Sequence, residues 1–550
     1  MFHVEHFLFY YKMKIFGKLV DVHSRTIFNA EILIENGIIA GISPTDYVCN
    51  RFILPGLIDA HVHIESSMLT PAAFAVEAVK HGTVAVVSDP HEIANVCGIA
   101  GVDFMIENSK SVPLKFFFGA PSCVPATPFE TNGAVLNETA VDKLMKKKEI
   151  HYLAEVMNYP AVIADEPSVM SKIASAKQRN KPADGHAPGL TGDSLKKYID
   201  AGISTDHECS SCLEAEEKIK MGMKILLREG SAARNLDNLK ELFHKYPESL
   251  MLCSDDLHPE MLVRGHINRL VGRLISEGYD IFDVIRSETV NPAIHYNTNA
   301  GMLRVGDCAD FIVTDSLEKM DILETWINGE QVFDNGKVSF EAPEQTALNN
   351  FNCRKIAVSD IKIIAEGSIV NVIKAFDGEI FTKRMPLPVW ETPELHSNTV
   401  NDALKIVVKD RYNDSSPSVA FISGFNLKRG AFASSIAHDS HNIICVGVAD
   451  NDIVSAINAV VDMRGGLAVC NEGNIYKLKL EIGGIMTSAS CTETAGLYLT
   501  LNEKISQMGC QLKAPFMTLS FMALLVIPEL KIGDKGLFDV TTFSKRALFE

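Results

Sequence analysis

Residues 54–65 read Leu54-Pro-Gly-Leu-Ile-Asp-Ala-His61-Val-His63-Ile-Glu65, an apolar run that ends in two histidines. Pro55 and Gly56 mark the start of a predicted buried strand. Residues i and i+2 of a strand point to the same face, so His61 and His63 are expected to project together from its end. Paired imidazoles are typical of half a metal site, and the alternative is a pair of ordinary core or surface histidines.

The region 54–302 alternates short apolar runs with amphipathic stretches. The predicted strands are 53–63, 83–88, 115–118, 151–157, 182–186, 203–207, 223–228 and 250–254. The predicted helices between them include 71–80, 141–148, 194–201, 212–221 and 236–246. This alternation indicates an α/β fold, and eight strands favour a TIM-type (β/α)8 barrel over a doubly wound sheet.

Short strand-like runs flank this region on both sides. Residues 13–53 and 303–338 are predicted to form one small β-sandwich domain into which the barrel, 54–302, is inserted. An Asn328-Gly329 turn joins two of the later strands. Beyond a polar linker, 345–550 is predicted to form a C-terminal α/β domain.

The composition limits the possible partners and compartments. The 550 residues carry a formal net charge of -17, which argues against a nucleic-acid-binding protein, because such proteins need a basic surface. The 12 cysteines show no disulfide-framework spacing, so we expect reduced thiols and a cytoplasmic location. The N-terminal segment lacks the basic start and cleavage site of a signal peptide. The apolar run 516–527 is too short for a bilayer, so we expect buried core and no membrane partner.

Polar residues follow almost every predicted strand, and in a barrel these strand ends share one mouth. The motifs are His61-Val-His63, Ser88-Asp-Pro-His-Glu92, Glu155, Asp184-Gly-His186, Thr205-Asp-His-Glu208, Arg228-Glu229 and Cys253-Ser-Asp-Asp256. A single histidine at a strand end is usually a satisfied polar residue. Several imidazoles and carboxylates converging on one mouth instead predict a hydrolase with two metal ions.

The sequence resembles the amidohydrolase superfamily and, within it, the adenine deaminase family. The barrel stretches that carry the resemblance are 55–68, 88–93, 184–189, 206–208, 228–234, 254–256 and 265–268. Gly424-Phe-Asn-Leu-Lys-Arg-Gly430 and Ala437-His-Asp-Ser-His-Asn-Ile443 resemble the family's C-terminal domain. The resemblance extends from about residue 15 to the end of the chain.

The resemblance implies a set of ligands and a reaction. The implied metal ligands are His61, His63, Glu155, His186, His207 and Asp255. Glu155 takes the bridging place, and Asp255 is implied both to bind metal and to accept a proton. The implied reaction, part of purine salvage, is attack of a metal-bridging hydroxide on C6 of adenine, giving hypoxanthine and ammonia. Glu155 and Asp89 are both candidates to protonate the purine ring.

The resemblance also implies two divalent cations, with Mn²⁺ ahead of Fe²⁺ and Zn²⁺ third, although ligand chemistry alone permits all three. We expect adenine as the small-molecule substrate and a homo-oligomer, with a dimer as the specific guess. The alternatives are another amidohydrolase that acts on a cyclic amide or aminopurine, and a non-catalytic barrel scaffold. A scaffold is disfavoured because the chain keeps all six implied ligands.

Several polar residues keep two interpretations. Asp89, His91, Glu92 and Ser254 are predicted to bind substrate, although the first three could equally contact or orient the metal ligands. Arg228 and Glu229 are interpreted as a buried ion pair that braces the barrel.

Asp256 is a second candidate for the place of Asp255. His438-Asp-Ser-His441 is interpreted as a polar turn rather than a second metal site, and a third possibility is a loop over the barrel mouth.

Overall fold

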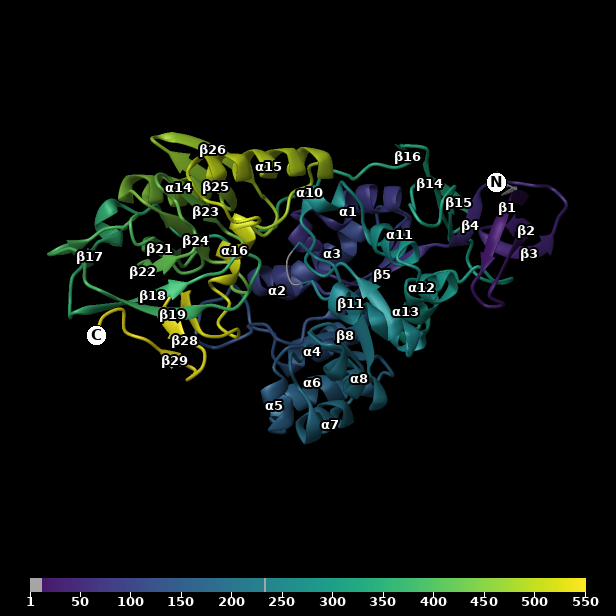
Figure 1. Cartoon of the computed structure of the whole chain (residues 1–550), viewed down its shortest axis with the longest axis horizontal. Helices are drawn as coiled ribbons and strands as arrows, with labels where there is room; N and C mark the ends of the chain where they lie inside the picture. Colours follow the sequence, from purple (N-terminus) through teal and green to yellow (C-terminus); the bar gives the residue numbers. More distant parts are fainter. Residues whose placement is uncertain (1–11, 232–233) are drawn as a thin grey trace, which may run out of the picture.

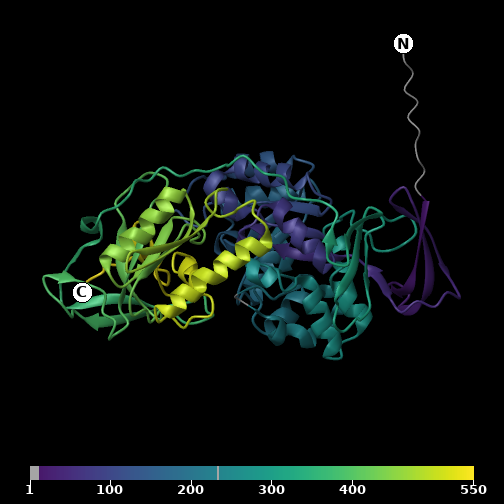
Figure 2. The same ribbon diagram turned by 90° about the horizontal axis from the view of Figure 1, so that it is seen from above.

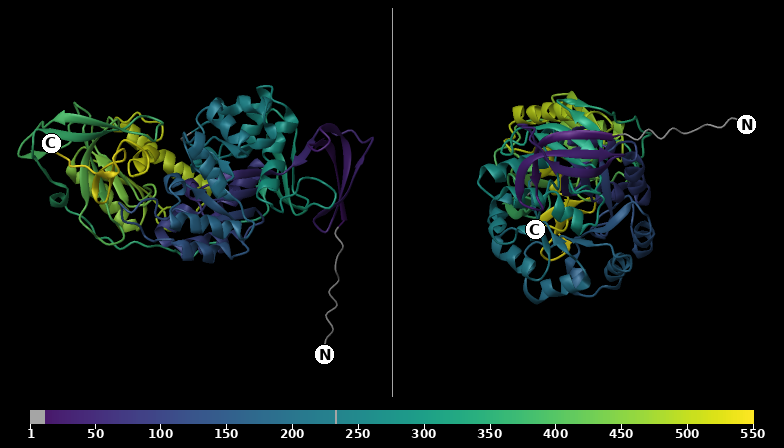
Figure 3. Two further views of the ribbon diagram at one scale, coloured as in Figure 1. Left: turned by 90° about the horizontal axis from the view of Figure 1, so that it is seen from below. Right: turned by 90° about the vertical axis from the view of Figure 1, so that its right-hand side faces the viewer.

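The computed structural model describes residues 12–231 and 234–550. The prediction that the N-terminal segment is not a signal peptide therefore concerns residues that lie largely outside the described ones. Three bodies form a row along the long axis: a small sheet, a central barrel and a C-terminal unit that comprises 358–550 (Figures 1 and 2). Viewed along the row, the small sheet lies in front of the barrel (Figure 3).

The barrel is a ring of parallel strands in chain order. Its strands are β5 (Leu57–Val62), β6 (Thr83–Ser88), β7 (Lys115–Ala120), β8 (Ile150–Val156), β9 (Ala183–Gly185), β10 (Thr205–Asp206), β11 (Lys224–Arg228) and β12 (Leu250–Cys253). Parallel bridges from Ala183 to Ile203 and from Val62 to Asp255 join the two sheets that these strands form. The predicted barrel is confirmed, and every strand end opens on the same face.

Helices cover the outside of the barrel. They are α1 (Pro71–Ala78), α2 (His91–Cys97), α3 (Ile99–Ser109), α4 (Glu138–Met145), α5 (Tyr159–Ile163), α6 (Pro167–Lys177), α7 (Gly192–Ala201), α8 (Cys212–Lys220), α9 (Leu236–Leu239), α10 (Pro259–Leu262), α11 (Ile267–Ser276), α12 (Ile281–Ser287) and α13 (Val290–His295). The prediction of one helix over 236–246 is wrong. There α9 passes into a 3₁₀ turn, Lys240–His244, before Pro247.

The small sheet combines both flanks of the barrel. Its strands are β1 (Lys12–Asp21), β2 (Thr26–Glu35), β3 (Ile38–Pro44), β4 (Phe52–Pro55), β13 (Phe311–Thr314), β14 (Ile322–Ile327), β15 (Glu330–Asp334) and β16 (Lys337–Val338). Strand β4 pairs with both β1 and β13, which joins the two flanks. Positive φ angles at Asn328 and Gly329 form the predicted turn between β14 and β15.

The single predicted strand over 53–63 is wrong, because the chain leaves one sheet and enters another at Gly56. Strand β4 belongs to the small sheet and β5 to the barrel. A Cβ atom at Gly56 would lie 2.3 Å from Cγ1 of Val84, so the close passage requires glycine. The domain boundaries at 13–53 with 303–338, 54–302 and 345–550 stay predictions.

The C-terminal unit is built on an eight-stranded mixed sheet. The strands of that sheet are β18 (Ile369–Lys374), β19 (Lys383–Pro388), β21 (Leu404–Lys409), β22 (Ser418–Ser423), β23 (Ala431–Ser434), β24 (Ile443–Gly447), β25 (Gly466–Asn471) and β26 (Asn474–Lys479). Smaller pairings involve β17 (Ile363–Ile364), β20 (Glu394–Leu395), β27 (Leu530–Gly533), β28 (Gly536–Asp539) and β29 (Ser544–Lys545).

Helices pack on both faces of this sheet because its strands are apolar on both sides. Ile443 and Cys445 of β24 pack with α14 (Asp450–Met463), whereas Ile444 and Val446 pack with α15 (Cys491–Gln507) and α16 (Pro515–Phe521). Helix α15 reaches the barrel (Figure 2), where the Cys491 thiol donates to the Pro259 carbonyl at 3.5 Å.

Within 12–231 and 234–550, no helix has the length and apolar character needed to cross a bilayer.

Candidate metal centre

The strand ends bring the six predicted ligands together. His61 and His63 lie at the end of β5, and their Nε2 atoms are 3.2 Å apart. Asp255, which follows β12, places Oδ1 3.5 Å from Nε2 of His61 and 3.3 Å from Nε2 of His63. Donor atoms at about 2.1 Å from one tetrahedral ion would lie roughly 3.4 Å apart, so these three side chains fit a shared cation.

Glu155 at the end of β8 connects this group to a second one. Its Oε1 atom lies 3.6 Å from Nε2 of His63. Its Oε2 atom lies 2.9 Å from Nδ1 of His186 and 3.1 Å from Nε2 of His207. One carboxylate therefore faces imidazoles on both sides, as a group bridging two ions must. The buried donors are nitrogen and carboxylate oxygen, which suit Mn²⁺, Fe²⁺ or Zn²⁺.

Buried hydrogen bonds fix the strand ends that carry these donors. The Asp59 carboxylate accepts from the Ser254 backbone N–H at 3.1 Å and from the Ser254 hydroxyl. The Nε2 atom of His266 lies 2.9 Å from the same carboxylate. Asp59 thus fixes the residue directly before Asp255. The predicted role of Ser254 in substrate binding stays a prediction, but its hydroxyl is engaged with Asp59.

Asp206 fixes a second pair of strand ends in the same way. Its carboxylate accepts from the Ala187 N–H at 3.0 Å and from Nζ of Lys218 at 2.6 Å. Burial raises the pKa of Asp206, but the charges of Lys218 and His207 outweigh it and lower that pKa to about 2. This ionised carboxylate holds the residues next to His186 and His207.

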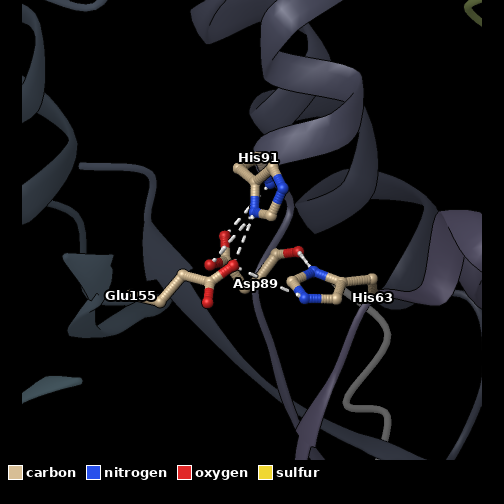
Figure 4. Close-up of side chains that lie close together, drawn as sticks. All are labelled: His63, Asp89, His91 and Glu155. Carbon is tan, nitrogen blue, oxygen red and sulfur yellow. Dashed lines mark hydrogen bonds and ion pairs between the residues drawn. The ribbon is translucent and has the colours of Figure 1, made fainter. Parts of the chain in front are cut away.

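Asp89 and His91 lie directly beside Glu155 (Figure 4). The Nδ1 atom of His91 is 3.3 Å from Oδ2 of Asp89 and 3.4 Å from Oε1 of Glu155. His63 uses its Nδ1 atom to contact the Asp89 carbonyl at 3.1 Å, which directs its Nε2 atom toward Asp255. Both interpretations of these residues, contact with substrate or orientation of the ligands, stay compatible with this arrangement.

The loop 438–441 of the C-terminal unit reaches the barrel mouth. Oε1 of Glu92 lies 2.7 Å from Nδ1 of His438, and Oε2 contacts Nε2 of His441. The His438 ring stacks on Phe521 with ring centres 4.8 Å apart. Residues 438–440 do form a turn before β24, as predicted, and this turn also lies against the barrel mouth, the third possibility, through a contact between residues 349 positions apart.

A cavity of about 70 Å³ lies between these groups. Its floor is mostly polar and comes from the barrel, with the side chains His63, His91, Glu92, Glu155, Met157, His186, His207, Glu208, Arg228, Asp255 and Asp256. Its opposite wall comes from the C-terminal unit and is mostly apolar, with Ile380, His438, Asp439, Phe521, Leu524, Val526 and Ile527. A flat, weakly polar ring fits such a wall, and the polar floor can contact its edge.

Arg228 is the cation of this floor, and its predicted pairing with Glu229 is wrong. Its Nη1 atom donates to Oε1 of Glu208 and to Oδ2 of Asp255, both at 2.6 Å, and Nη2 donates to Oε2 of Glu208 at 2.8 Å. The Glu229 carboxylate instead lies 3.9 Å from Arg273. Burial raises the pKa of Asp255, but the charge of Arg228 and contacts from His61 and His63 hold it well below its usual range.

The fold and this set of donors define a member of the amidohydrolase family, which the chain matches over residues 52–332. Residues 379–544 match the adenine deaminase C-terminal domain. The chain belongs to the adenine deaminase family within that group.

The similarity to individual relatives covers almost the whole chain. An adenine deaminase of Methanosarcina barkeri is 51% identical over 543 residues, which is 97% of this chain and 98% of the relative. An adenine deaminase of Salinibacter ruber is 48% identical over 533 residues, with 96% and 97% covered. Among solved structures, an enamidase of the amidohydrolase superfamily is 19% identical with a TM-score of 0.44, covering 60% of this chain and 97% of its own.

Proposed function

We propose that the chain catalyses the hydrolytic deamination of adenine to hypoxanthine and ammonia at a centre of two divalent cations. The observation that carries this proposal is the position of Glu155 between two sets of imidazoles. Family membership supports the substrate, because the curated relatives are named adenine deaminases.

We propose His61, His63 and Asp255 for one cation, His186 and His207 for the other, and Glu155 as the shared ligand. Mn²⁺ is the first choice and Fe²⁺ the second, because the resemblance to the family implies that order. The donors themselves, imidazole and carboxylate without thiolate, suit Mn²⁺, Fe²⁺ and Zn²⁺ alike. Bound at these residues, two divalent cations would supply a nucleophilic water near neutral pH and Lewis-acid polarisation.

The residues of the chain then handle the protons. Asp255 is ionised beside Arg228, so it can accept a proton from the attacking water. A C6–O bond forms and the C6–N bond breaks. The exocyclic amino group gains one proton and leaves as ammonia, and the ring nitrogen keeps the other proton that the water supplies. Glu155 and Asp89 both remain candidates to protonate the ring, because both contact His91, which lines the cavity.

The remaining cavity residues are proposed to bind the purine. His91 and Glu92 face the cavity from the start of α2 and offer polar contacts to the ring edge. Phe521 and Ile527 offer apolar contact to its face. We propose that Ser254 does not contact the substrate. Its hydrogen bonds to Asp59 instead help to hold the adjacent Asp255 in place.

The test is ammonia release and hypoxanthine formation by protein that is freed of metal and then loaded with Mn²⁺ or Fe²⁺. We expect Glu155→Gln to lose activity and bound metal together, because it removes the shared charged ligand. Glu107→Gln is the matched control, since Glu107 is 70% exposed and forms a surface ion pair with Lys110 at 2.6 Å. Wild-type protein that is inactive on adenine with both metals would contradict the proposal. Turnover of a hydantoin, dihydropyrimidine or other aminopurine in preference to adenine would favour the alternative amidohydrolase.

Two expectations from the sequence stay proposals alongside this one, a homodimer and a cytoplasmic location. Sedimentation of the purified protein tests the first, and localisation of a tagged chain in its host cell tests the second.

A further inference from the structure

Glu92 is an active-site carboxylate of the barrel whose shortest side-chain contacts come from the C-terminal unit. It lies in the first turn of α2, and its residue is only 2% exposed. Both of its oxygens face histidines of the loop 438–441, Oε1 facing His438 and Oε2 facing His441. A buried carboxylate needs such partners, because a buried charge without a partner is strongly destabilising.

The loop that presents these histidines is itself fixed on both sides. The Tyr412 hydroxyl donates to the Ser440 carbonyl at 2.6 Å. The side-chain amide of Asn442 donates to the Thr131 carbonyl of the barrel at 2.9 Å. The His438 ring is held against Phe521. The two histidines therefore meet Glu92 from a pre-formed loop and lose little conformational freedom on contact.

The contacts of His441 also fix which of its nitrogens carries the proton. The Ala437 N–H points at Nδ1 of His441 at 3.4 Å, and a backbone N–H can only donate. Nδ1 must therefore accept, and Nε2 carries the hydrogen that His441 donates to Glu92. Burial lowers the pKa of His441 to about 4, which agrees with a neutral ring.

Glu92 is connected through His91 to the shared carboxylate of the metal centre. Oε1 of Glu92 lies 3.6 Å from Nε2 of His91, and Nδ1 of the same ring lies 3.4 Å from Oε1 of Glu155. A change in the orientation of Glu92 would change that of His91. His441 is not among the described residues that line the cavity. Its hydrogen bond to a lining residue goes to Glu92, and its ring also lies edge-on to that of His438, with ring centres 5.8 Å apart.

We propose that His441, together with His438, is a positioning residue that fixes the Glu92 carboxylate, so that the C-terminal unit completes the active site of the barrel. This inference rests on the proposed deaminase function. It assigns the C-terminal unit a role in catalysis, in addition to its apolar wall. The competing interpretation is an interface contact that stabilises the two units without affecting the reaction.

The test compares two amide replacements in the full-length, Mn²⁺-loaded protein. His441→Gln keeps an N–H donor with reach similar to that of the imidazole, whereas His441→Asn is shorter and falls short of Glu92. We expect kcat/KM for adenine to fall about 10- to 100-fold in His441→Asn, the value of a hydrogen bond to a charged group. We expect His441→Gln to stay within about fivefold of wild type. His396→Asn is the matched control, since His396 also contacts a glutamate, Glu391 at 3.2 Å, but is 50% exposed.

A double-mutant cycle with Glu92→Gln separates positioning from stability. If His441 acts through Glu92, then His441→Asn lowers kcat/KM by less than about threefold in the Glu92→Gln background. A full 10- to 100-fold loss in that background would overturn the proposal. So would a His441→Asn enzyme with wild-type kcat/KM, or equal losses in His441→Asn and His441→Gln. Wild-type protein that fails to deaminate adenine would instead overturn the proposed function, which distinguishes the two failures.

Discussion

Replacement of Arg228 tests whether a single buried cation organises the acidic floor of the cavity. Arg228 is 8% exposed, and its guanidinium lies between Glu208 and Asp255. Arg228→Gln removes the positive charge, so the carboxylates of Glu208 and Asp255 lose their cationic partner. We expect a large loss of activity, because Asp255 is the residue proposed to bind metal and accept the proton.

The structure sets the size of this loss. The bond from Nη1 to Oδ2 of Asp255 is 2.6 Å long and buried. A hydrogen bond to a charged group contributes about 1.5 to 3 kcal/mol, which corresponds to a roughly 10- to 150-fold loss in kcat/KM. Truncation of a buried ion pair also costs stability, about 3 to 5 kcal/mol. Arg228→Lys should fall between wild type and Arg228→Gln, since an ammonium keeps the charge but cannot donate in the planar, forked geometry of arginine.

The assay is steady-state adenine deamination at saturating Mn²⁺, with metal content and thermal unfolding measured on the same samples. Arg273→Gln is the control, because Arg273 also contacts several carboxylates but is partly exposed, and such pairs contribute at most about 1 kcal/mol. Arg228→Gln activity within threefold of wild type, at full metal occupancy, would refute the assigned role of the guanidinium.

Two further outcomes follow from buried lysines. Lys218→Met should lower the free energy of unfolding by about 3 to 5 kcal/mol, because the 0% exposed ammonium bridges Asp206 and Glu214, each at 2.6 Å. Thermal unfolding checks this against Lys220→Met, the replacement of a 61% exposed neighbour. Equal effects of the two replacements would contradict the prediction. Burial lowers the pKa of Lys531 from 10.5 to about 7. Between these two pH values the unfolded chain therefore binds more protons than the folded one. The free energy of unfolding should rise from pH 7 toward 10.5 by up to about 1.4 kcal/mol per pH unit. Unfolding midpoints at pH 7 to 9.5 measure that slope, and Lys531→Met should flatten it; an unchanged slope would count against the assignment.

The barrel and its polar mouth were predictable because both follow from local patterns. Apolar runs separated by amphipathic helices favour parallel strands, and parallel strands in a barrel present their carboxyl ends together. His61, His186 and Asp255 each follow such a run directly, so their convergence needed no knowledge of tertiary contacts. The structure brings these donors to spacings suited to metal binding.

The partners of charged residues were less predictable than their positions. Arg228 ends β11 and Glu229 follows it, and successive side chains of a strand point to opposite faces. Adjacent residues are therefore poor partners, and Arg228 instead pairs with Glu208 and Asp255 across neighbouring strand ends. The alternation rule was available from the sequence, but the neighbouring strand ends that supply the partners were not.

Two other features depended on tertiary contacts. The break at Gly56 arises from close contact with Val84, which no local pattern indicates. The contact of Glu92 with His441 joins two units far apart in the sequence. Resemblance to the family C-terminal domain identified the loop, but its place over the barrel mouth depends on how the two units pack.

The most direct test of the metal centre is a titration of metal-free protein with Mn²⁺, in which bound metal and adenine deamination are measured together. We expect activity to rise to a plateau at two ions per chain, and His61→Ala or His63→Ala to lose metal and activity together. A plateau at one ion per chain, full activity without metal, or full activity of either histidine variant at low metal would contradict a centre bridged by Glu155.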